Sequence, residues 1–401
     1  MTTLPDALRG TRLADPRGVA LLLGVAQTLA WAGTYYLPAV LAPAVVADLG
    51  ADPALVYGAF SLALLISGLA APRTGRAIEQ FGGRPVLILS SCVIALGLAL
   101  LGLLPGIWGW FLGWIVLGPG MALGLYEAAF ATLGVLYGQA ARRSITMVTL
   151  VAGFASTVGW PLTAALLPQL GWRGTCLAYA GINLLLVLPL YLLLPRSGPG
   201  GGAPEAGTAR MEAPPPAGWV RRSFLLLAGF FTLRAVISAT LSVHMITVLG
   251  GLGLSVAAAV GAASLMGPSQ VGGRLLEFTL GKGAHPLTVA RLGAALLPLG
   301  ALVLVLVGPV AAVPFVLLYG ASNGILTISR GAVPLALFGA RGYPVLMGRL
   351  ALPILLAQAA APALTAPLVA ALPAVAVLGL AGFLAALAMA CLLPLRPPAG
   401  C

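Results

Sequence analysis

Gly75-Arg76-Ala77-Ile78-Glu79 is the stretch that decides how the chain is interpreted, because it returns in altered form as Gly273-Arg274-Leu275-Leu276-Glu277. The second copy begins 198 positions after the first (273 − 75), about half of the 401-residue chain. Each copy is charged, follows the second long apolar run of its half and is predicted to form a short loop. A charged segment that repeats at half-length between apolar runs predicts a membrane protein with two duplicated halves.

The composition also predicts an integral membrane protein. The chain is 60% hydrophobic and 7% charged, with a mean hydropathy of +1.06, which is unlike a soluble domain. A net charge of +12 would suit a protein that binds nucleic acid, but such proteins gather their basic residues on one exposed surface. Here the basic residues are scattered among short connections, so we expect no nucleic-acid partner. The abundance of Ala, Gly, Leu and Pro indicates a GC-rich, bacterial genome.

The cysteines and the N-terminus give little sign of other chemistry. The four cysteines show no C-x-x-C spacing, and two of them lie inside apolar runs, so neither a disulfide nor a metal site is predicted. We expect no cofactor. The first apolar run is too long for a signal-peptide core and should remain as a helix.

Twelve apolar runs are long enough to cross a bilayer, whose core of about 30 Å requires roughly 20 apolar residues per helix. Nearly all basic residues fall on alternate connections, which places those connections and both termini in the cytoplasm. The opposite connections contain only Asp48, Asp52 and Arg173 as charged residues. The predicted spans are 19–42, 54–73, 85–104, 108–136, 145–168, 173–194, 223–247, 254–279, 287–308, 311–337, 343–369 and 372–394.

A stretch rich in Pro, Gly and Ala separates spans six and seven and cannot bury enough apolar surface to fold. We therefore predict an N-terminal six-helix bundle over 1–195, a flexible cytoplasmic linker over 196–220 and a C-terminal six-helix bundle over 221–401. Small residues that let helices approach closely also repeat between the halves at an offset of 200. They are Gly120 and Gly124 in span four, and Gly320 and Gly324 in span ten.

Twelve spans, a long central linker and a charged segment after span two together resemble the major facilitator superfamily over essentially the whole chain. The loop motif of that family reads G-x-x-x-D-[RK]-x-G-[RK]-[RK], and residues 75–84 read G-R-A-I-E-Q-F-G-G-R. Glu79 replaces the Asp and Gln80 replaces the first basic residue, which should weaken the charge pairing. The resemblance implies that this segment locks the cytoplasmic side in one state; the alternative is that its charges only fix the topology. The predicted gating residues are Gly75, Glu79, Gly82, Arg84, Gly273, Arg274 and Glu277.

Subfamily features favour an anion carrier over a drug antiporter. Proton-driven drug antiporters of this family carry an Arg early in span four, where this chain has Trp114, and a G-P-x-x-G element where it has Gly159-Trp160-Pro161-Leu162. The stretch 31–38, W-A-G-T-Y-Y-L-P, resembles bacterial carriers near the monocarboxylate and oxalate/formate branches. Their arginine in span eight corresponds to Ser269 here, so another arginine would have to contact the substrate.

Ionisable residues inside helices are candidates for function, because a charge in the bilayer costs at least a few kcal/mol. Three of the five are arginines, and a positive interior suits an anion, since guanidinium groups bind carboxylate or phosphate oxygens in pairs. We expect Arg234, midway along span seven, to contact the substrate. We interpret His244 as interfacial and expect Arg349 to extend to water. The candidates are Glu127, Arg234, His244, Arg330 and Arg349.

Glu127 and Arg330 belong together in the prediction. At the offset of 200, Arg330 corresponds to Phe130, one turn from Glu127 on the same helix face. The resemblance implies that spans four and ten lie beside a central cavity, so the pair either forms a salt bridge or contacts substrate or proton. Glu127 is the candidate for proton coupling, because the pKa of a carboxyl group rises when it loses an Arg partner and water.

Polar side chains at helix depth complete the predicted substrate site. The three tyrosines could line a cavity or lie at the interface, and the two amides could bind substrate or join helices. These residues are Tyr35, Tyr36, Tyr126, Gln270 and Asn323.

We predict a secondary transporter that moves a small solute by alternating access, most simply a symporter of a small organic anion and protons. Efflux of amphipathic drugs or neutral metabolites, or a transporter-like sensor without flux, remain as alternatives. The sequence contains no G-x-x-x-x-G-K-[ST] nucleotide loop and no H-E-x-x-H spacing, so neither an ATP-driven pump nor an enzyme is favoured. We expect a monomer in a bacterial inner membrane, with lipid and a small-molecule substrate as its partners.

Overall fold

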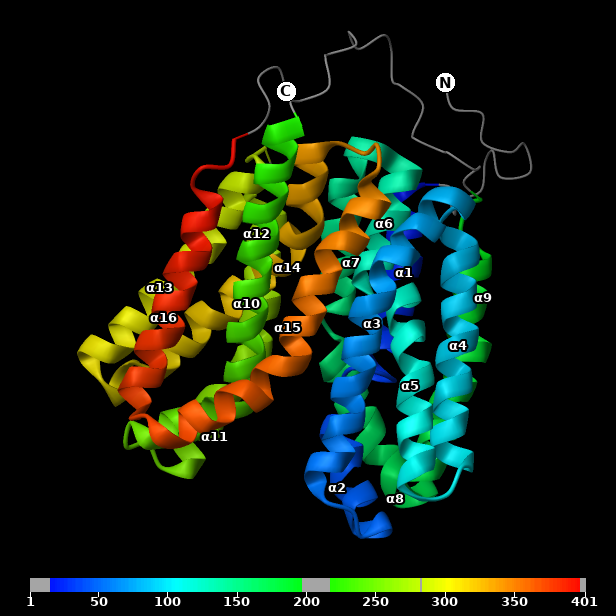
Figure 1. The fold of residues 1–401 in the computed structure, drawn as a ribbon, viewed down its shortest axis with the longest axis horizontal. Helices are drawn as coiled ribbons and strands as arrows, with labels where there is room; N and C mark the ends of the chain where they lie inside the picture. Colours follow the sequence, from blue (N-terminus) through cyan, green and yellow to red (C-terminus); the bar gives the residue numbers. More distant parts are fainter. Residues whose placement is uncertain (1–14, 197–216, 282, 397–401) are drawn as a thin grey trace, which may run out of the picture. The chain divides into compact units, whose positions relative to one another are not determined.

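The computed structural model describes residues 15–196, 217–281 and 283–396 of the chain. Its regular elements are all helical, and no strand occurs in these ranges (Figure 1). The chain divides into two compact units: unit 1 comprises residues 1–210 and 339–352, and unit 2 comprises 211–338 and 353–401. The predicted division at 196–220 stays a prediction, since 197–216 of that linker lie outside the described ranges.

The helices coincide with the twelve predicted spans. Eight helical stretches in the described ranges are long and apolar enough to cross a membrane, and one of them, 106–192, contains spans four to six. Spans one, four, five and eight are each built from two helices. The helices of unit 1 are α1 (Pro16–Ala32), α2 (Pro38–Leu49), α3 (Pro53–Phe81), α4 (Gly83–Leu103), α5 (Gly106–Gly124), α6 (Tyr126–Tyr137), α7 (Ala141–Ala152), α8 (Ala155–Ile182) and α9 (Leu188–Leu192).

Unit 2 repeats this order of spans with fewer interruptions. Its helices are α10 (Ala217–Gly251), α11 (Val256–Ser264), α12 (Met266–Leu280), α13 (Pro286–Val307), α14 (Ala312–Phe338) and α16 (Ala374–Leu392). Helix α15 (Tyr343–Ala371) contributes its first residues to unit 1 and the residues from Pro353 onward to unit 2.

Three breaks shape unit 1. The chain turns through residues 33–37 before Pro38 starts α2, a position that suits the fixed φ of proline. Leu125 has an extended conformation (φ −83°, ψ −167°) and separates α5 from α6. Gly171, at φ +64°, turns the chain between spans five and six. Inside a membrane each break exposes backbone groups that need protein partners.

The recurring pentapeptide does not form a loop. Helix α3 continues through Gly75 and Glu79 to Phe81, and only Gly82, at φ +82°, turns the chain. The second copy lies inside α12. The predicted loop conformation is therefore wrong in both places, whereas the gating role of these residues stays a prediction. Glycine alone does not end a helix, and Gly75 is needed for packing, because a Cβ there would collide with the backbone of Pro344.

The glycine pairs of spans four and ten allow close helix contacts, as predicted, but they face different helices in the two halves. Gly120 and Gly124 pack on α4, against Ile94 and Ser90, whereas Gly320 and Gly324 pack on α12. Helix α4 is the third span of the N-terminal half, whereas α12 belongs to the second span of the C-terminal half. Residues related by the offset of 200 therefore do not pack against corresponding helices. The equivalence of Arg330 and Phe130 therefore has no support from packing.

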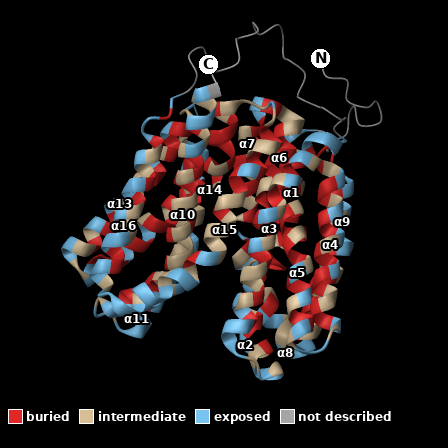
Figure 2. Cartoon of the chain, in the orientation of Figure 1, coloured by how far each residue is buried: buried red, intermediate tan, exposed pale blue. Residues whose placement is uncertain are grey.

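Each unit buries one set of helix faces and exposes apolar side chains on others (Figure 2). In unit 2, apolar side chains of α10, α13, α14 and α16 form a continuous buried cluster. By contrast, Leu185 of unit 1 and Leu306 of unit 2 are 75% and 74% exposed. Large apolar side chains on outer helix faces are expected where the solvent is lipid.

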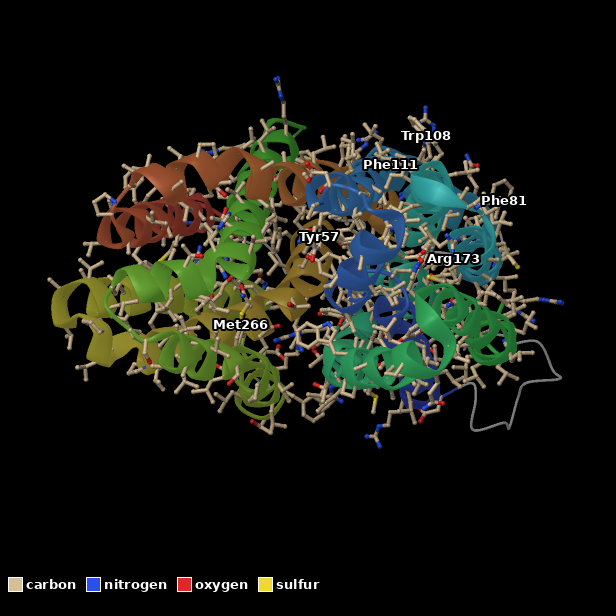
Figure 3. The ribbon with its side chains drawn as sticks, turned by 90° about the horizontal axis from the view of Figure 1, so that it is seen from below. Tyr57, Phe81, Trp108, Phe111, Arg173 and Met266 are labelled. Atoms are coloured by element: carbon tan, nitrogen blue, oxygen red, sulfur yellow. The ribbon has the colours of Figure 1, made fainter. Side chains whose placement is uncertain are left out.

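Two of the three charges on the predicted outer connections bind each other near the turn at Gly171. The Trp172 indole donates a hydrogen bond to Asp48 Oδ2 (2.9 Å), and Arg173 lies 3.7 Å from the same oxygen. Arg173 also donates to the Leu104 carbonyl (2.7 Å) and stacks over the Trp172 ring (4.2 Å). Figure 3 marks the place of Arg173. This cluster joins three connections of unit 1.

We expect Gly97→Leu to lower the melting temperature of the purified protein. A Cβ at Gly97, on α4, would lie 2.7 Å from the Leu117 side chain of α5, and overpacking of this kind costs about 1–3 kcal/mol. The matched control is Gly181→Leu on α8, where no atom lies within 4 Å of the added Cβ. Equal melting temperatures for the two variants in detergent would contradict the α4–α5 packing described here.

Candidate functional site

A buried polar cluster in unit 2 contains two of the predicted substrate-binding residues. Arg234, midway along α10 and only 6% exposed, donates from Nη2 to Asn323 Oδ1 on α14 (2.7 Å). Ser238, one turn after Arg234, donates to the same oxygen (3.1 Å). The Tyr319 hydroxyl, one turn before Asn323, lies 3.5 Å from Ser238 Oγ. The spacing of four on each helix places all four side chains along one α10–α14 contact.

This cluster has more donors than acceptors. Asn323 Oδ1 accepts both of these hydrogen bonds, which leaves the amide nitrogen, a group that only donates. Arg234 Nη1 is buried and has no hydrogen-bond partner among the described residues. The only carboxylate in the described part of unit 2 belongs to Glu277 on α12, and no ion pair joins it to Arg234. The arrangement can therefore accept an anion that brings its own oxygen atoms.

Other predicted residues of unit 2 lie around this cluster. Gln270, on α12, is half-buried, and its backbone approaches Gly324, the residue after Asn323. Arg330 lies on α14 seven residues, or two turns, after Asn323 and thus on the same helix face. His244 lies farther along α10, where its Nε2 is buried without a hydrogen-bond partner in the described ranges.

In unit 1 the predicted tyrosines gather around Trp31. The ring of Trp31 lies 4.8 Å from that of Tyr126, 5.1 Å from that of Tyr35 and 6.1 Å from that of Tyr36, measured between centroids. The turn after α1 makes this possible, because it brings Tyr35 and Tyr36 back beside the end of that helix. Trp160 extends the cluster, with its ring 5.8 Å from Tyr36.

Gln27, which is not among the predicted site residues, holds this part of unit 1 together. Its side chain is fully buried, donates from Nε2 to the Gly124 carbonyl (2.5 Å) and accepts from the Trp31 indole (3.3 Å). Gly124 is the last residue of α5, so Gln27 binds a carbonyl beside the break at Leu125. A lone amide in an apolar run, one turn before Trp31, is the signal that would have identified it.

Glu127 lies in the first turn of α6, directly after the break. Backbone N–H groups at a helix N-terminus favour a negative charge, so the break creates a suitable place for a carboxylate. Glu127 interacts electrostatically with the buried Tyr343 of α15, which belongs to the same unit. Arg330 belongs to unit 2, and its predicted pairing with Glu127 stays a prediction.

The predicted gating residues of the first copy lie near the end of α3 and the start of α4, and those of the second copy lie within α12. Gly75 packs on the backbone of Pro344, and the Glu79 carboxylate approaches Gly342, both near the start of α15. Gly82 makes the turn and Arg84 lies in the first turn of α4. In the second copy, Gly273 packs on Ala321 of α14, while Arg274 and Glu277 are 6% and 8% exposed within α12. The gating role itself stays a prediction.

Comparison with known proteins agrees with this architecture. A family model described as Major Facilitator Superfamily matches residues 23–343. No curated protein matches the chain by sequence. Among solved structures, the human organic anion transporter MFSD10 (TETRAN) is similar, with a TM-score of 0.76, 17% identity and coverage of 94% of this chain and 99% of that chain. The fucose:proton symporter FucP of E. coli has a TM-score of 0.68 and 16% identity, with coverage of 93% and 96%. The proton:xylose symporter XylE has a TM-score of 0.68 and 14% identity, with coverage of 94% of each chain.

Stability measurements should separate a ligand-binding role of Arg234 from a structural one. We expect Asn323→Leu to destabilise the substrate-free protein by about 1–3 kcal/mol, because it removes the acceptor of a buried guanidinium. Arg234→Met should leave the stability unchanged or raise it, since a buried charge without a carboxylate is replaced by an apolar chain. Thermal unfolding in detergent tests both.

The double variant Arg234→Met/Asn323→Leu provides the control. If the lost acceptor causes the damage, the double variant should be more stable than Asn323→Leu alone, because both partners are then apolar. A large loss of stability in Arg234→Met would instead make Arg234 a structural residue.

Proposed function

Because the chain belongs to the Major Facilitator Superfamily, we propose that it is a secondary active transporter that carries a small organic anion by alternating access and couples this movement to protons. The observation that supports an anion is Arg234, which is buried in unit 2 with its Nη1 unbonded in the described ranges. A charge at this depth is costly, so a protein that keeps it is expected to use it.

The chemistry of the cluster favours a carboxylate in particular. One side of the guanidinium is fixed by Asn323, which orients the remaining N–H groups, and planar guanidinium binds two carboxylate oxygens in parallel. The Asn323 amide nitrogen adds a neutral donor on the same helix contact. The solved structures share 17% identity or less with this chain, so their similarity supports the fold and the argument for an anion rests on Arg234.

Proton coupling is assigned to Glu127. An ionisable group in the first turn of a membrane helix is costly and is therefore expected to be functional. A carboxyl group that binds and releases a proton can link protonation to a conformational change. Glu127 also interacts electrostatically with Tyr343 of unit 1.

The proposed setting is a bacterial inner membrane, with a monomer whose two termini and linker face the cytoplasm. The distribution of Arg between alternate connections supports this orientation.

The aromatic cluster of unit 1 supports the alternative substrates. Rings of Trp31, Tyr35, Tyr36 and Trp160 offer a wide, weakly polar surface that suits an amphipathic or neutral compound. A sensor without flux is the further alternative, supported by the two substitutions in the loop motif at Glu79 and Gln80.

Counterflow of labelled carboxylates in proteoliposomes tests the anion proposal. The wild-type protein should show saturable exchange of at least one small mono- or dicarboxylate. We expect Arg234→Met to weaken the apparent affinity by about 10-fold to 100-fold, the value of a charged hydrogen bond of 1.5–3 kcal/mol. Arg234→Lys should recover only part of this, since an ammonium lacks the planar fork.

Arg349→Met is the matched control, because Arg349 is an exposed arginine on α15. Its exchange should equal that of the wild type. Exchange of neutral or amphipathic compounds alone, with no carboxylate flux from a folded wild-type protein, would replace the anion proposal by the alternative. Absence of flux for every class would favour the sensor.

Glu127→Gln should separate exchange from proton drive. Glutamine keeps the shape of the side chain and cannot titrate, so we expect carboxylate exchange to persist while uptake driven by a pH gradient falls to background. The measurement compares counterflow with pH-driven accumulation in the same vesicles. Accumulation at the wild-type level would remove Glu127 from the proton pathway.

A further inference from the structure

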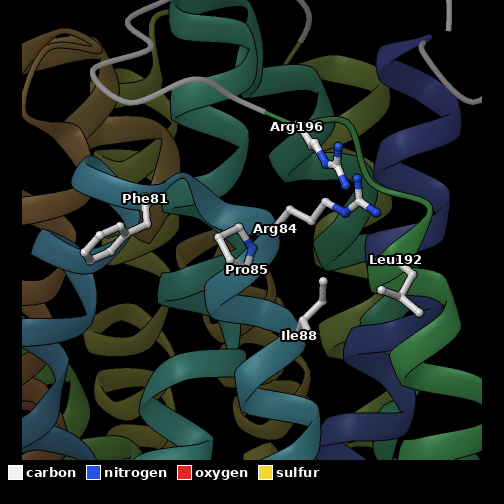
Figure 4. Close-up of a pocket in the computed structure, with 6 residues that line it drawn as sticks. All are labelled: Phe81, Arg84, Pro85, Ile88, Leu192 and Arg196. Atoms are coloured by element: carbon white, nitrogen blue, oxygen red, sulfur yellow. The ribbon is translucent and has the colours of Figure 1, made fainter. Parts of the chain in front are cut away.

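Unit 1 has a surface pocket of about 340 Å³ whose lining includes none of the predicted substrate-binding residues. One lining residue, Arg84, is also a predicted gating residue. It lies where α3 ends and α4 begins, beside α9 and the residues that follow it (Figure 4). Helix α4 contacts α9, so the pocket is supported by two packed helices. Its lining residues are Phe81, Arg84, Pro85, Ile88, Leu192 and Arg196.

Two arginines from different helices meet above an apolar floor in this pocket. The guanidinium groups of Arg84 and Arg196 extend toward each other, and Ile88 and Leu192 lie below them (Figure 4). Within the described ranges neither guanidinium has a hydrogen-bond or ion-pair partner. Two like charges held together repel each other, and an anion between them would reverse that repulsion.

The start of α4 adds to the positive field at this place. Gly82, which precedes the helix, supplies no side-chain cap, so the first N–H groups of a 21-residue helix receive no bond from a capping side chain. The positive end of the helix dipole therefore lies beside Arg84. The helix end alone would not define a site, but here it accompanies two unpaired arginines and a pocket.

The surface next to the pocket is apolar in the manner of a lipid-facing surface. Leu192 in the pocket is 46% exposed, and Leu193, Leu89 and Leu185 on the neighbouring turns are 47%, 52% and 75% exposed. The two arginines thus lie beside several exposed leucines. This is the arrangement expected at the level of the lipid headgroups.

We propose that this pocket binds an anionic phospholipid, with the headgroup phosphate between Arg84 and Arg196 and an acyl chain along Ile88 and Leu192. Free phosphate would explain the two arginines but would gain nothing from the apolar floor. A zwitterionic lipid would place its cationic group in the same positive field. The proposal stands apart from the transported substrate, because these residues lie outside the Arg234 cluster.

Native mass spectrometry of the full-length protein tests the proposal, with phosphatidylglycerol and phosphatidylcholine of identical acyl chains as probes. An arginine near an anionic lipid surface contributes about fivefold in affinity, so the pair should favour phosphatidylglycerol by about 25-fold. We expect Arg84→Gln/Arg196→Gln to reduce this preference to near twofold.

The matched control is Arg73→Gln/Arg143→Gln, which removes two exposed arginines of unit 1 that do not line the pocket. It should keep the preference of the wild type. An equal loss in both double variants would show attraction by overall charge and would overturn the proposal. Retention of the preference in Arg84→Gln/Arg196→Gln would also overturn it.

A second variant tests the apolar floor and remains informative if the arginine variant does not fold. Ile88→Trp keeps both charges and fills the pocket, so it should weaken phosphatidylglycerol binding about tenfold or more. Unchanged binding would contradict the proposal. Displacement of phosphatidylglycerol by millimolar inorganic phosphate with equal effect on the wild type and Ile88→Trp would assign the site to free phosphate instead of lipid.

Discussion

Inside a bilayer, a backbone carbonyl that lacks a helical hydrogen-bond partner has no water to bind, so another protein group must donate to it. At the break after Gly124 in unit 1, the side chain of Gln27 is that donor. The bond from Nε2 to that carbonyl ties α1 to the end of α5. The same amide orients Trp31 through its oxygen. A new helix, α6, begins at Tyr126 directly after the break, so Glu127 lies in the first turn of that helix. The aromatic cluster and the proton candidate of unit 1 thus depend on one buried amide.

Buried polar groups in the two units differ in how completely they are used. The buried Gln27 uses its donor and its acceptor. The half-buried Arg291 of α13 donates to the carbonyl of Leu392, the last residue of α16, and to those of Leu393 and Leu395 beyond it. Both therefore complete the backbone bonding that a membrane demands. Arg234 is also buried, yet its Nη1 has no hydrogen-bond acceptor in the described ranges. A buried N–H group without an acceptor lowers the free energy of unfolding, and no contact within the described ranges offsets this loss. We therefore interpret Arg234 as a residue that binds a ligand.

The sequence predicted the features that depend only on the order of residues along the chain. The twelve spans follow from the length of apolar runs, and Arg234 and Asn323 stood out because polar groups are costly at those depths. Residues whose importance depends on a neighbouring helix were missed: Ser238 and Tyr319 are ordinary until α10 and α14 pack together. The break at Leu125 could not be predicted, since leucine favours helices and the amide that binds the carbonyl beside the break, Gln27, lies on another helix.

The recurring pentapeptide reveals the duplication but not the packing of its copies. In the first copy Gly75 lies against the start of α15, and in the second Gly273 lies against α14. Arg84 follows the first copy at a surface pocket, whereas Arg274 and Glu277 of the second are buried in α12. A repeat in sequence therefore conserves the helical segment and its charge while the contacts diverge. Functional roles have to be assigned to each copy from its own neighbours, because the same five positions meet different surfaces in the two units.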